Sequence, residues 1–210
     1  MVIVMMGMQG SGKGTQSKML AEKLDLPHIS TGDIFRANIG QGTELGKRAQ
    51  AFTDKGELVP DSITIDMVRD RLGEPDVAKG CLLDGFPRNA VQLAALEFFR
   101  PADHCVLLEL DEATAIARLG QRSECPKCGI LYGANKKPKE RGTCDECGGP
   151  LKIRTDDTDV EAVRTRLANY ANEIDVMVRY YDWKGALRRV DGCQTVDEVF
   201  ADVLKALGAA

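Results

Sequence analysis

Residues 7–13 have the composition and spacing of a phosphate-binding loop. They read Gly-Met-Gln-Gly-Ser-Gly-Lys, which fits the pattern G-x-x-x-x-G-K. Glycines let the backbone wrap closely around a phosphate, and the N-terminus of the following helix favours negative charge. Lys13 would reach the outer phosphates. A chance glycine turn is the alternative, but the loop lies between an apolar run, 2–6, and a predicted helix, as the motif requires. A dinucleotide fingerprint cannot be laid over this loop.

Four cysteines have the spacing of a structural zinc site. Two C-x-x-C pairs, Cys125 with Cys128 and Cys144 with Cys147, are separated by fifteen residues. Each pair can form a tight turn that aims two thiolates at one tetrahedral ion, and four thiolates leave no open position for catalysis. Disulfides and a thioredoxin-type redox pair are the alternatives. The other three cysteines lie in or beside apolar strands and are expected to be buried packing residues: Cys81, Cys105 and Cys193.

Several arginines lack an acidic partner at helical spacing. Arg118 and Arg122 lie four residues apart, where like charges repel, and neither has an acidic residue three or four positions away. Arg166 is in the same situation, whereas Arg164 has Glu161 one turn back. Cations that crowd one another predict an anionic ligand, although an ordinary solvated face remains the alternative.

The order of the predicted elements places these residues in an α/β fold. Strands alternate with helical stretches, which predicts a parallel sheet flanked by helices. Asp84 ends a predicted strand at 81–84, where a phosphate-loop enzyme keeps an acid near Mg²⁺. Asp61 is expected to cap the helix that follows it in the sequence. The predicted strands are 2–6, 28–29, 81–84, 105–110 and 188–191, and the predicted helices include 13–23, 89–99, 112–121, 160–181 and 196–207.

Composition limits the class of protein. The chain has 210 residues, of which 43% are hydrophobic, enough for one globular α/β domain with small insertions. A net charge of −4 argues against a general nucleic-acid binder. No apolar run is long enough for a transmembrane helix, and the start lacks the features of a signal peptide. We therefore expect a cytoplasmic protein with reduced thiols.

Several segments resemble the adenylate kinases among the nucleoside monophosphate kinases. The match covers nearly the whole chain, and its most specific part is Asp-Gly-Phe-Pro-Arg at 84–88. Gly-Lys-Gly-Thr at 12–15 resembles the family's phosphate loop, although Gln9 stands where the family usually has Pro. The other matching segments are 30–36 and 56–61 on the acceptor side and Arg-Thr-Asp-Asp at 154–157 after the cysteine-rich segment.

The resemblance implies a domain division and a reaction. It implies a core of 1–29, 60–121 and 159–210, a helical AMP-binding insertion at 30–59, and a zinc-ribbon-like lid at 122–158. The implied reaction is MgATP + AMP = 2 ADP, with Mg²⁺ bound to ATP and a structural Zn²⁺ in the lid. The implied protein is a monomer that binds neither nucleic acid nor membrane.

The resemblance also implies site residues. Those with a catalytic role are Lys13, Arg88, Arg122, Arg154 and Arg166. Those that bind ATP are Gly10, Ser11, Gly12, Lys13, Gly14, Thr15, Arg118, Arg122, Leu131, Tyr132 and Gln194. Those that bind AMP are Thr31, Arg36, Glu57, Leu58, Val59, Gly85, Phe86, Pro87, Arg88, Gln92, Arg154 and Arg166. The metal ligands are Cys125, Cys128, Cys144 and Cys147.

Three alternatives remain open at this point. One is a kinase for UMP, CMP or GMP, and a second is a kinase that uses GTP in place of ATP. The third is a phosphate-loop switch whose zinc ribbon binds nucleic acid, because five basic residues lie at 127–141.

Overall fold

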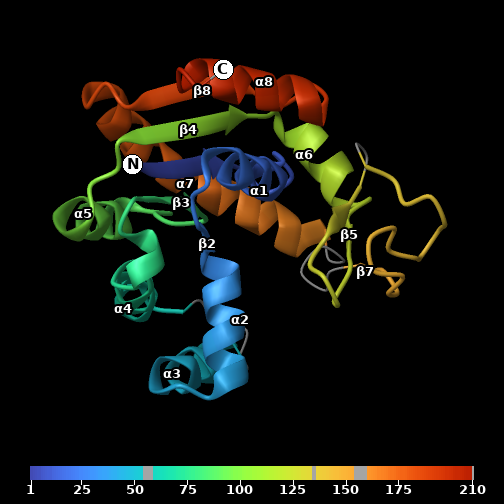
Figure 1. Cartoon of the computed structure of the whole chain (residues 1–210), viewed down its shortest axis with the longest axis horizontal. Coiled ribbons are helices and arrows are strands. Elements are labelled where there is room, and N and C mark those ends of the chain that lie inside the picture. Colours follow the sequence, from blue (N-terminus) through green and yellow to red (C-terminus); the bar gives the residue numbers. More distant parts are fainter. Residues whose placement is uncertain (54–58, 134–135, 154–159, 210) are drawn as a thin grey trace.

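The computed structural model describes residues 1–53, 59–133, 136–153 and 160–209. Its centre is a parallel five-stranded sheet with the order β2-β3-β1-β4-β8 (Figure 1). This is the predicted three-layer α/β fold with helices on both faces of the sheet. The strands are β1 (Val2–Gly7), β2 (His28–Ser30), β3 (Cys81–Asp84), β4 (His104–Glu109) and β8 (Leu187–Asp191).

The central strand β1 explains the layering. All six of its residues are buried, as expected for a strand between two parallel neighbours with both faces covered. Alternate side chains point to opposite faces, so Val2, Val4 and Met6 join one hydrophobic cluster. Ile3 and Met5 join another on the reverse face.

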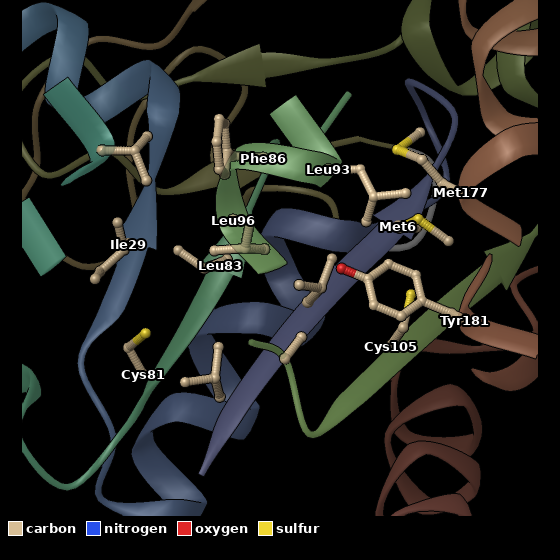
Figure 2. Packing of buried hydrophobic residues seen from close by; sticks show 14 of the residues in the cluster. Met6, Ile29, Cys81, Leu83, Phe86, Leu93, Leu96, Cys105, Met177 and Tyr181 are labelled. Atoms are coloured by element: carbon tan, nitrogen blue, oxygen red, sulfur yellow. The ribbon is translucent and has the colours of Figure 1, made fainter. Parts of the chain in front are cut away.

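Different helices cover the two faces. Helices α4 (Asp61–Leu72), α5 (Ala90–Phe99) and α7 (Val160–Trp183) contribute to the cluster around Met6. In that cluster Leu93 and Met177 lie beside Met6, and the ring of Tyr181 lies close to Cys105 (Figure 2). Helices α1 (Lys13–Leu24) and α8 (Val196–Ala206) supply Leu20 and Val203 to the other face.

Two smaller units extend from this core. Helices α2 (Thr31–Gln41) and α3 (Glu44–Thr53) pack on α4, and a small cluster around Ala49, Ile63 and Met67 holds them there. Helix α6 (Glu112–Leu119) leads into the second unit, a three-stranded sheet of β5 (Ser123–Glu124), β6 (Leu131–Tyr132) and β7 (Lys152–Ile153). Figure 1 shows the two units at separate edges of the core.

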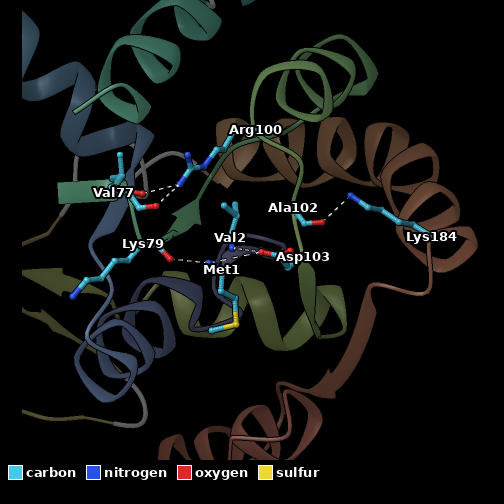
Figure 3. A network of polar contacts seen from close by, with 9 residues as sticks. Met1, Val2, Val77, Lys79, Arg100, Ala102, Asp103 and Lys184 are labelled. Carbon is cyan, nitrogen blue, oxygen red and sulfur yellow. Dashed lines mark hydrogen bonds and ion pairs between the residues drawn. The ribbon is translucent and has the colours of Figure 1, made fainter. Parts of the chain in front are cut away.

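Polar contacts anchor the start of β1 at the edge opposite the phosphate loop. The amino group of Met1 donates to the carbonyl of Lys79 at 2.8 Å, and the Val2 amide donates to Asp103 Oδ2 at 2.6 Å (Figure 3). Arg100 donates to the Val77 carbonyl at 2.7 Å, and Lys184 donates to that of Ala102. These contacts hold the start of β1 and the segments around it at the amino edge of the sheet. The site lies at the opposite, carboxyl edge, on strands that are anchored in this way.

Two expectations about single residues were wrong. Asp61 does not cap α4, because its carboxylate instead accepts hydrogen bonds from α5 and the residue before it. Cys193 is exposed, since it lies in the turn after β8, whereas Cys81 and Cys105 are buried as expected.

None of the described helices is both long and apolar enough to span a bilayer.

Candidate active site

The carboxyl ends of three parallel strands bring the site residues together. Met5 of β1 pairs with Asp84 of β3, and Asp84 pairs in turn with Ser30 of β2. The residues that follow each strand therefore emerge at one edge of the sheet. In open α/β sheets this edge is where ligands bind.

The phosphate loop has the geometry that its glycines permit. Gly7, Gly10 and Gly12 have φ angles of 149°, 87° and 89°, a range that other residues rarely adopt. Gly12 precedes α1 without a side-chain cap, and the first turn of α1 contains no acidic residue. The N-terminal amides and the helix dipole can therefore act on a bound anion.

The loop also contains buried polar atoms that make no hydrogen bond. Within the described part of the chain, Gln9 Oε1 and Ser11 Oγ are buried and have no hydrogen-bond partner. Buried polar atoms without a partner cost free energy, so a ligand or water would stabilise them. Lys13 Nζ donates to the Met8 carbonyl at 3.2 Å, a contact within the loop itself.

Charged side chains converge on Lys13. Burial lowers the pKa of Lys13 to about 8; Asp84 opposes this effect, while the cations of Arg88 and Arg122 add to it. Burial raises the pKa of Asp84, but His28, Lys13 and Arg88 together bring it below its usual range. The distance between His28 Nε2 and Asp84 Oδ2 is 3.6 Å. The site therefore combines an ionised acid with three cations from different elements.

The turn after β3 forms a compact polar cluster with the start of α2. Thr31 Oγ1 donates to the Gly85 carbonyl at 3.1 Å, and Arg88 Nε donates to the same carbonyl at 2.7 Å. Arg88 Nη2 lies 3.5 Å from Thr31 Oγ1. A β-carbon at Gly85 would lie 2.8 Å from Thr31 Oγ1, so the close approach requires glycine, and the φ of 80° favours it. Phe86 is buried in the core, which fixes the turn from below.

Gln92 lies directly behind this turn. The residue is 5% exposed, and its Oε1 accepts from the Arg88 backbone amide at 2.8 Å. Its Nε2 donates to Asp61 Oδ1 at 2.7 Å. Arg36, by contrast, is exposed and pairs with Asp33 on its own helix.

Arg118 connects the phosphate loop with the turn after β8. Its Nη1 donates to the Gly192 carbonyl at 2.8 Å and lies 3.5 Å from the Gly10 carbonyl. Its Nη2 donates to the Cys193 carbonyl at 3.3 Å. Gln194, in the same turn, donates to Asp202 at 2.9 Å. Arg118 of α6, predicted to bind ATP, thus lies between the phosphate loop and the turn that contains Gln194, another predicted ATP-binding residue.

The cysteine-rich unit contacts the first helix. Lys18 Nζ donates to the Gly129 carbonyl at 3.0 Å, and Leu131 Cδ1 lies 3.9 Å from where a β-carbon of Gly14 would stand. Tyr132 is buried inside the unit, where its hydroxyl accepts from the Asp145 amide at 2.8 Å. Its predicted contact with ATP stays a prediction.

The four predicted metal ligands form one cluster. The sulfurs of Cys125, Cys128, Cys144 and Cys147 all lie within 4.8 Å of one another. Neighbouring sulfurs are 3.4–3.5 Å apart, longer than the roughly 2.05 Å of a disulfide bond. A tetrahedral zinc site with Zn–S bonds of about 2.3 Å places its sulfurs about 3.8 Å apart. Burial raises the pKa of Cys144, but hydrogen bonds from Tyr132 and backbone amides outweigh it and bring the pKa to about 6. The donor set therefore fits zinc.

Some predicted site residues cannot be placed. Glu57, Leu58 and Arg154 lie outside the described residues, as does the side chain of Arg166. Val59 packs beside the cluster of α2, α3 and α4. The structure also adds residues that spacing did not reveal, because their contacts join distant parts of the chain. They are Asp61 beside Gln92, Lys18 against the cysteine-rich unit, and Gln16, whose Nε2 donates to the Val196 carbonyl at 2.8 Å.

Comparison with known proteins assigns the family. A family model described as Adenylate kinase matches residues 5–186. The adenylate kinase of Lachnospira eligens is 45% identical over 214 aligned residues, which cover 99% of this chain and 100% of the relative. Those of Clostridium tetani and Methanocella arvoryzae are each 44% identical, with coverage of 100% and 99% of this chain and 99% and 98% of the relatives. The chain therefore belongs to the adenylate kinase family, phosphotransferases that act reversibly between ATP and AMP.

Proposed function

We propose that this chain catalyses MgATP + AMP = 2 ADP, with the ATP phosphates over residues 7–13 and AMP beside Thr31, Gly85 and Arg88. The observation that carries the proposal is the convergence of Lys13, Asp84, Arg88 and Arg122 at the carboxyl edge of the sheet. Cations from separate elements at one point suit two anionic substrates, whose mutual repulsion the enzyme must overcome.

The chemistry needs no general base. A nucleoside monophosphate has a second pKa near 6, so its attacking oxygen is largely anionic at pH 7. We assign to Lys13 and Arg122 the neutralisation of charge on the transferred group, and to Arg88 the orientation of the acceptor phosphate. Arg118 binds on the ATP side, and Arg154 and Arg166 complete the cationic set by family resemblance.

Mg²⁺ belongs with the ATP phosphates, where it would neutralise charge and orient them. Asp84 fits this ion, directly or through water, because it is buried, ionised and next to the phosphate loop. Thr15, the third residue of α1, provides the first hydroxyl after the loop in the sequence.

Water must be excluded, because it would otherwise accept the phosphoryl group. We assign this task to a lid at 122–158 and an AMP-binding insertion at 30–59. The contacts of Lys18 and Leu131 support a lid that closes over the phosphate loop. Loops and small domains commonly gate kinases in this way.

A coupled assay of ADP formation tests the proposal. ATP and GTP are offered as donors against AMP, GMP, CMP and UMP as acceptors. We expect ATP with AMP to give the highest kcat/KM. A higher value with another acceptor or donor would support one of the alternative nucleotide kinases instead.

We further propose that the cysteine cluster binds one structural Zn²⁺. In its described residues the lid has a small core around Cys125, Tyr132 and Cys144, so a metal would supply stability that this packing does not. Elemental analysis should find one zinc per chain, and chelation should lower the melting temperature. Metal-free protein of equal stability would contradict this role.

We also propose that the protein acts in the cytoplasm as a monomer, without a nucleic-acid or membrane partner. The net charge of −4 and a complete set of predicted site residues within one chain support this. Light scattering tests the monomer, and a filter-binding titration at several salt concentrations tests for nucleic acid.

A further inference from the structure

The amide of Gln92 is held from both ends. Its Oε1 accepts from the backbone amide of Arg88 at 2.8 Å, and its Nε2 donates to Asp61 Oδ1 at 2.7 Å. Gln92 is the third residue of α5 and Arg88 lies two residues before that helix, in the turn proposed to hold the acceptor phosphate. Because Gln92 is almost fully buried, water cannot replace these two hydrogen bonds if the side-chain amide takes another orientation.

The chemistry of the two partners decides which way the amide points. A backbone N–H can only donate, so it must face the oxygen of Gln92. A carboxylate can only accept, so Asp61 must face the NH₂ group. Turning the amide over would place oxygen against the carboxylate and N–H against N–H, and both hydrogen bonds would be lost.

Asp61 is itself positioned by Asn89. As the N-cap of α5, Asn89 accepts a hydrogen bond at its side-chain oxygen from the backbone N–H of Gln92, at 2.9 Å. The Nδ2 of Asn89 must therefore point away from the helix. That Nδ2 lies 3.0 Å from each oxygen of Asp61. The carboxylate therefore joins the start of α4 to the start of α5 and cannot turn away from Gln92 without breaking both contacts.

The locked amide keeps one acceptor and one donor for a ligand. After its two internal bonds, Gln92 has one lone pair on Oε1 and one hydrogen on Nε2. Adenine offers the complementary pair, a donor at its 6-amino group and an acceptor at N1. Hypoxanthine and guanine offer the reverse, an acceptor at O6 and a donor at N1.

We propose that Asp61 is a positioning residue for base specificity: it fixes the Gln92 amide in the orientation that accepts a 6-aminopurine and rejects a 6-oxopurine. The inference rests on the proposed function and adds one assignment to it: Gln92, which the family resemblance places among the AMP-binding residues, faces the base of the acceptor nucleotide. Asp61 acts through Gln92 and does not touch the base.

The test compares AMP with inosine monophosphate as acceptors. Inosine monophosphate inverts the two groups of the base edge and adds no further substituent. In wild-type protein kcat/KM should favour AMP strongly. Asp61→Ala should lower this preference at least tenfold, because turning the amide over then costs only the hydrogen bond with Arg88. A hydrogen bond to a charged group typically contributes a factor of about ten or more.

Two further variants separate positioning from structure. Asp61→Asn keeps an acceptor oxygen of weaker strength, so it should restore part of the preference and lower it only about fivefold. Asp66→Asn is the matched control on the same helix, since Asp66 is partly exposed and pairs with Arg69. It should leave the preference unchanged.

A double-mutant cycle with Gln92→Leu completes the experiment. If Asp61 acts through Gln92, adding Asp61→Ala to Gln92→Leu will not change the preference further. Should Asp61→Ala fail to fold, the cycle is run with Asp61→Asn. An unchanged preference in the single Asp61 variant, or an equal further loss in the Gln92→Leu background, would overturn the inference. Wild-type protein that uses AMP and inosine monophosphate equally would overturn it as well, whereas wild-type protein inactive with AMP would overturn the proposed function instead.

Discussion

Replacing Lys13 with Met should abolish turnover and stabilise the folded protein. Burial lowers the pKa of Lys13 from 10.5 to about 8. Because each pKa unit corresponds to about 1.36 kcal/mol, the charged lysine costs the folded state at most about 3.4 kcal/mol at pH 7. Lys13 is only half-buried, and Met would lose the contact with the Met8 carbonyl. We therefore expect a net gain of about 1–2 kcal/mol in the free energy of unfolding.

The gain has a defined pH dependence. The folded pKa lies below the unfolded pKa, so between pH 8 and 10.5 the unfolded wild-type chain binds more protons than the folded chain. The stability of the wild type therefore rises relative to Lys13→Met across this interval. The advantage of the variant should be complete below pH 8 and should vanish near pH 10.5.

Thermal melts and the coupled assay measure the two effects together. For a chain of this size, 1–2 kcal/mol should raise the melting temperature by roughly 2–8 °C. The kcat should fall at least a hundredfold, as for other lost donors to a developing charge. Lys23→Met, an exposed change on the same helix, is the control and should alter neither quantity. A lower melting temperature for Lys13→Met, or more than a tenth of wild-type kcat, would refute the reasoning.

Three further results are expected. Arg88→Ala should lower kcat far more than Arg164→Ala, because Arg164 is an exposed residue near Glu161; equal effects would contradict the assignment. ATP binding at pH 8.5 should take up protons, because the phosphate charge raises the pKa of Lys13. Calorimetry in buffers of different ionisation enthalpy measures this uptake, and a binding enthalpy that does not depend on the buffer would contradict it. Cys144→Ser should release zinc and lower the melting temperature while leaving activity measurable at low temperature, whereas Cys193→Ser should retain the metal; loss of metal from the second variant would show that the ligand set is wrong.

Much of the fold follows from local patterns. The apolar run at 2–6 predicted a buried strand, and its position at the centre of the sheet explains why it lacks alternation. The cysteine spacing predicted one cluster, because two C-x-x-C turns leave little freedom for their sulfurs. These signals are local, so neither required knowledge of distant contacts.

Residues with long-range contacts were harder to predict. Arg118 has no acidic neighbour at helical spacing, as expected, yet its guanidinium is satisfied by carbonyls of Gly192 and Cys193 more than seventy positions away. Asp61 has the residue type and place of a helix cap, but stronger partners across the α4–α5 contact compete for its carboxylate. Cys193 was expected to be buried because it follows a strand, but the chain turns there into solvent. Helical or strand periodicity describes one element and contains no information about these contacts.

The altered pKa of Lys13 connects stability with catalysis. Burial, Arg88 and Arg122 all disfavour its charge, and only Asp84 among the named neighbours favours it. The folded protein without nucleotide thus holds a cluster of cations that repel one another. Bound phosphates relieve that repulsion, so part of the binding free energy is used to complete an arrangement prepared during folding. Because the arrangement does not need to form during the reaction, it can stabilise charge in the transition state without further reorganisation.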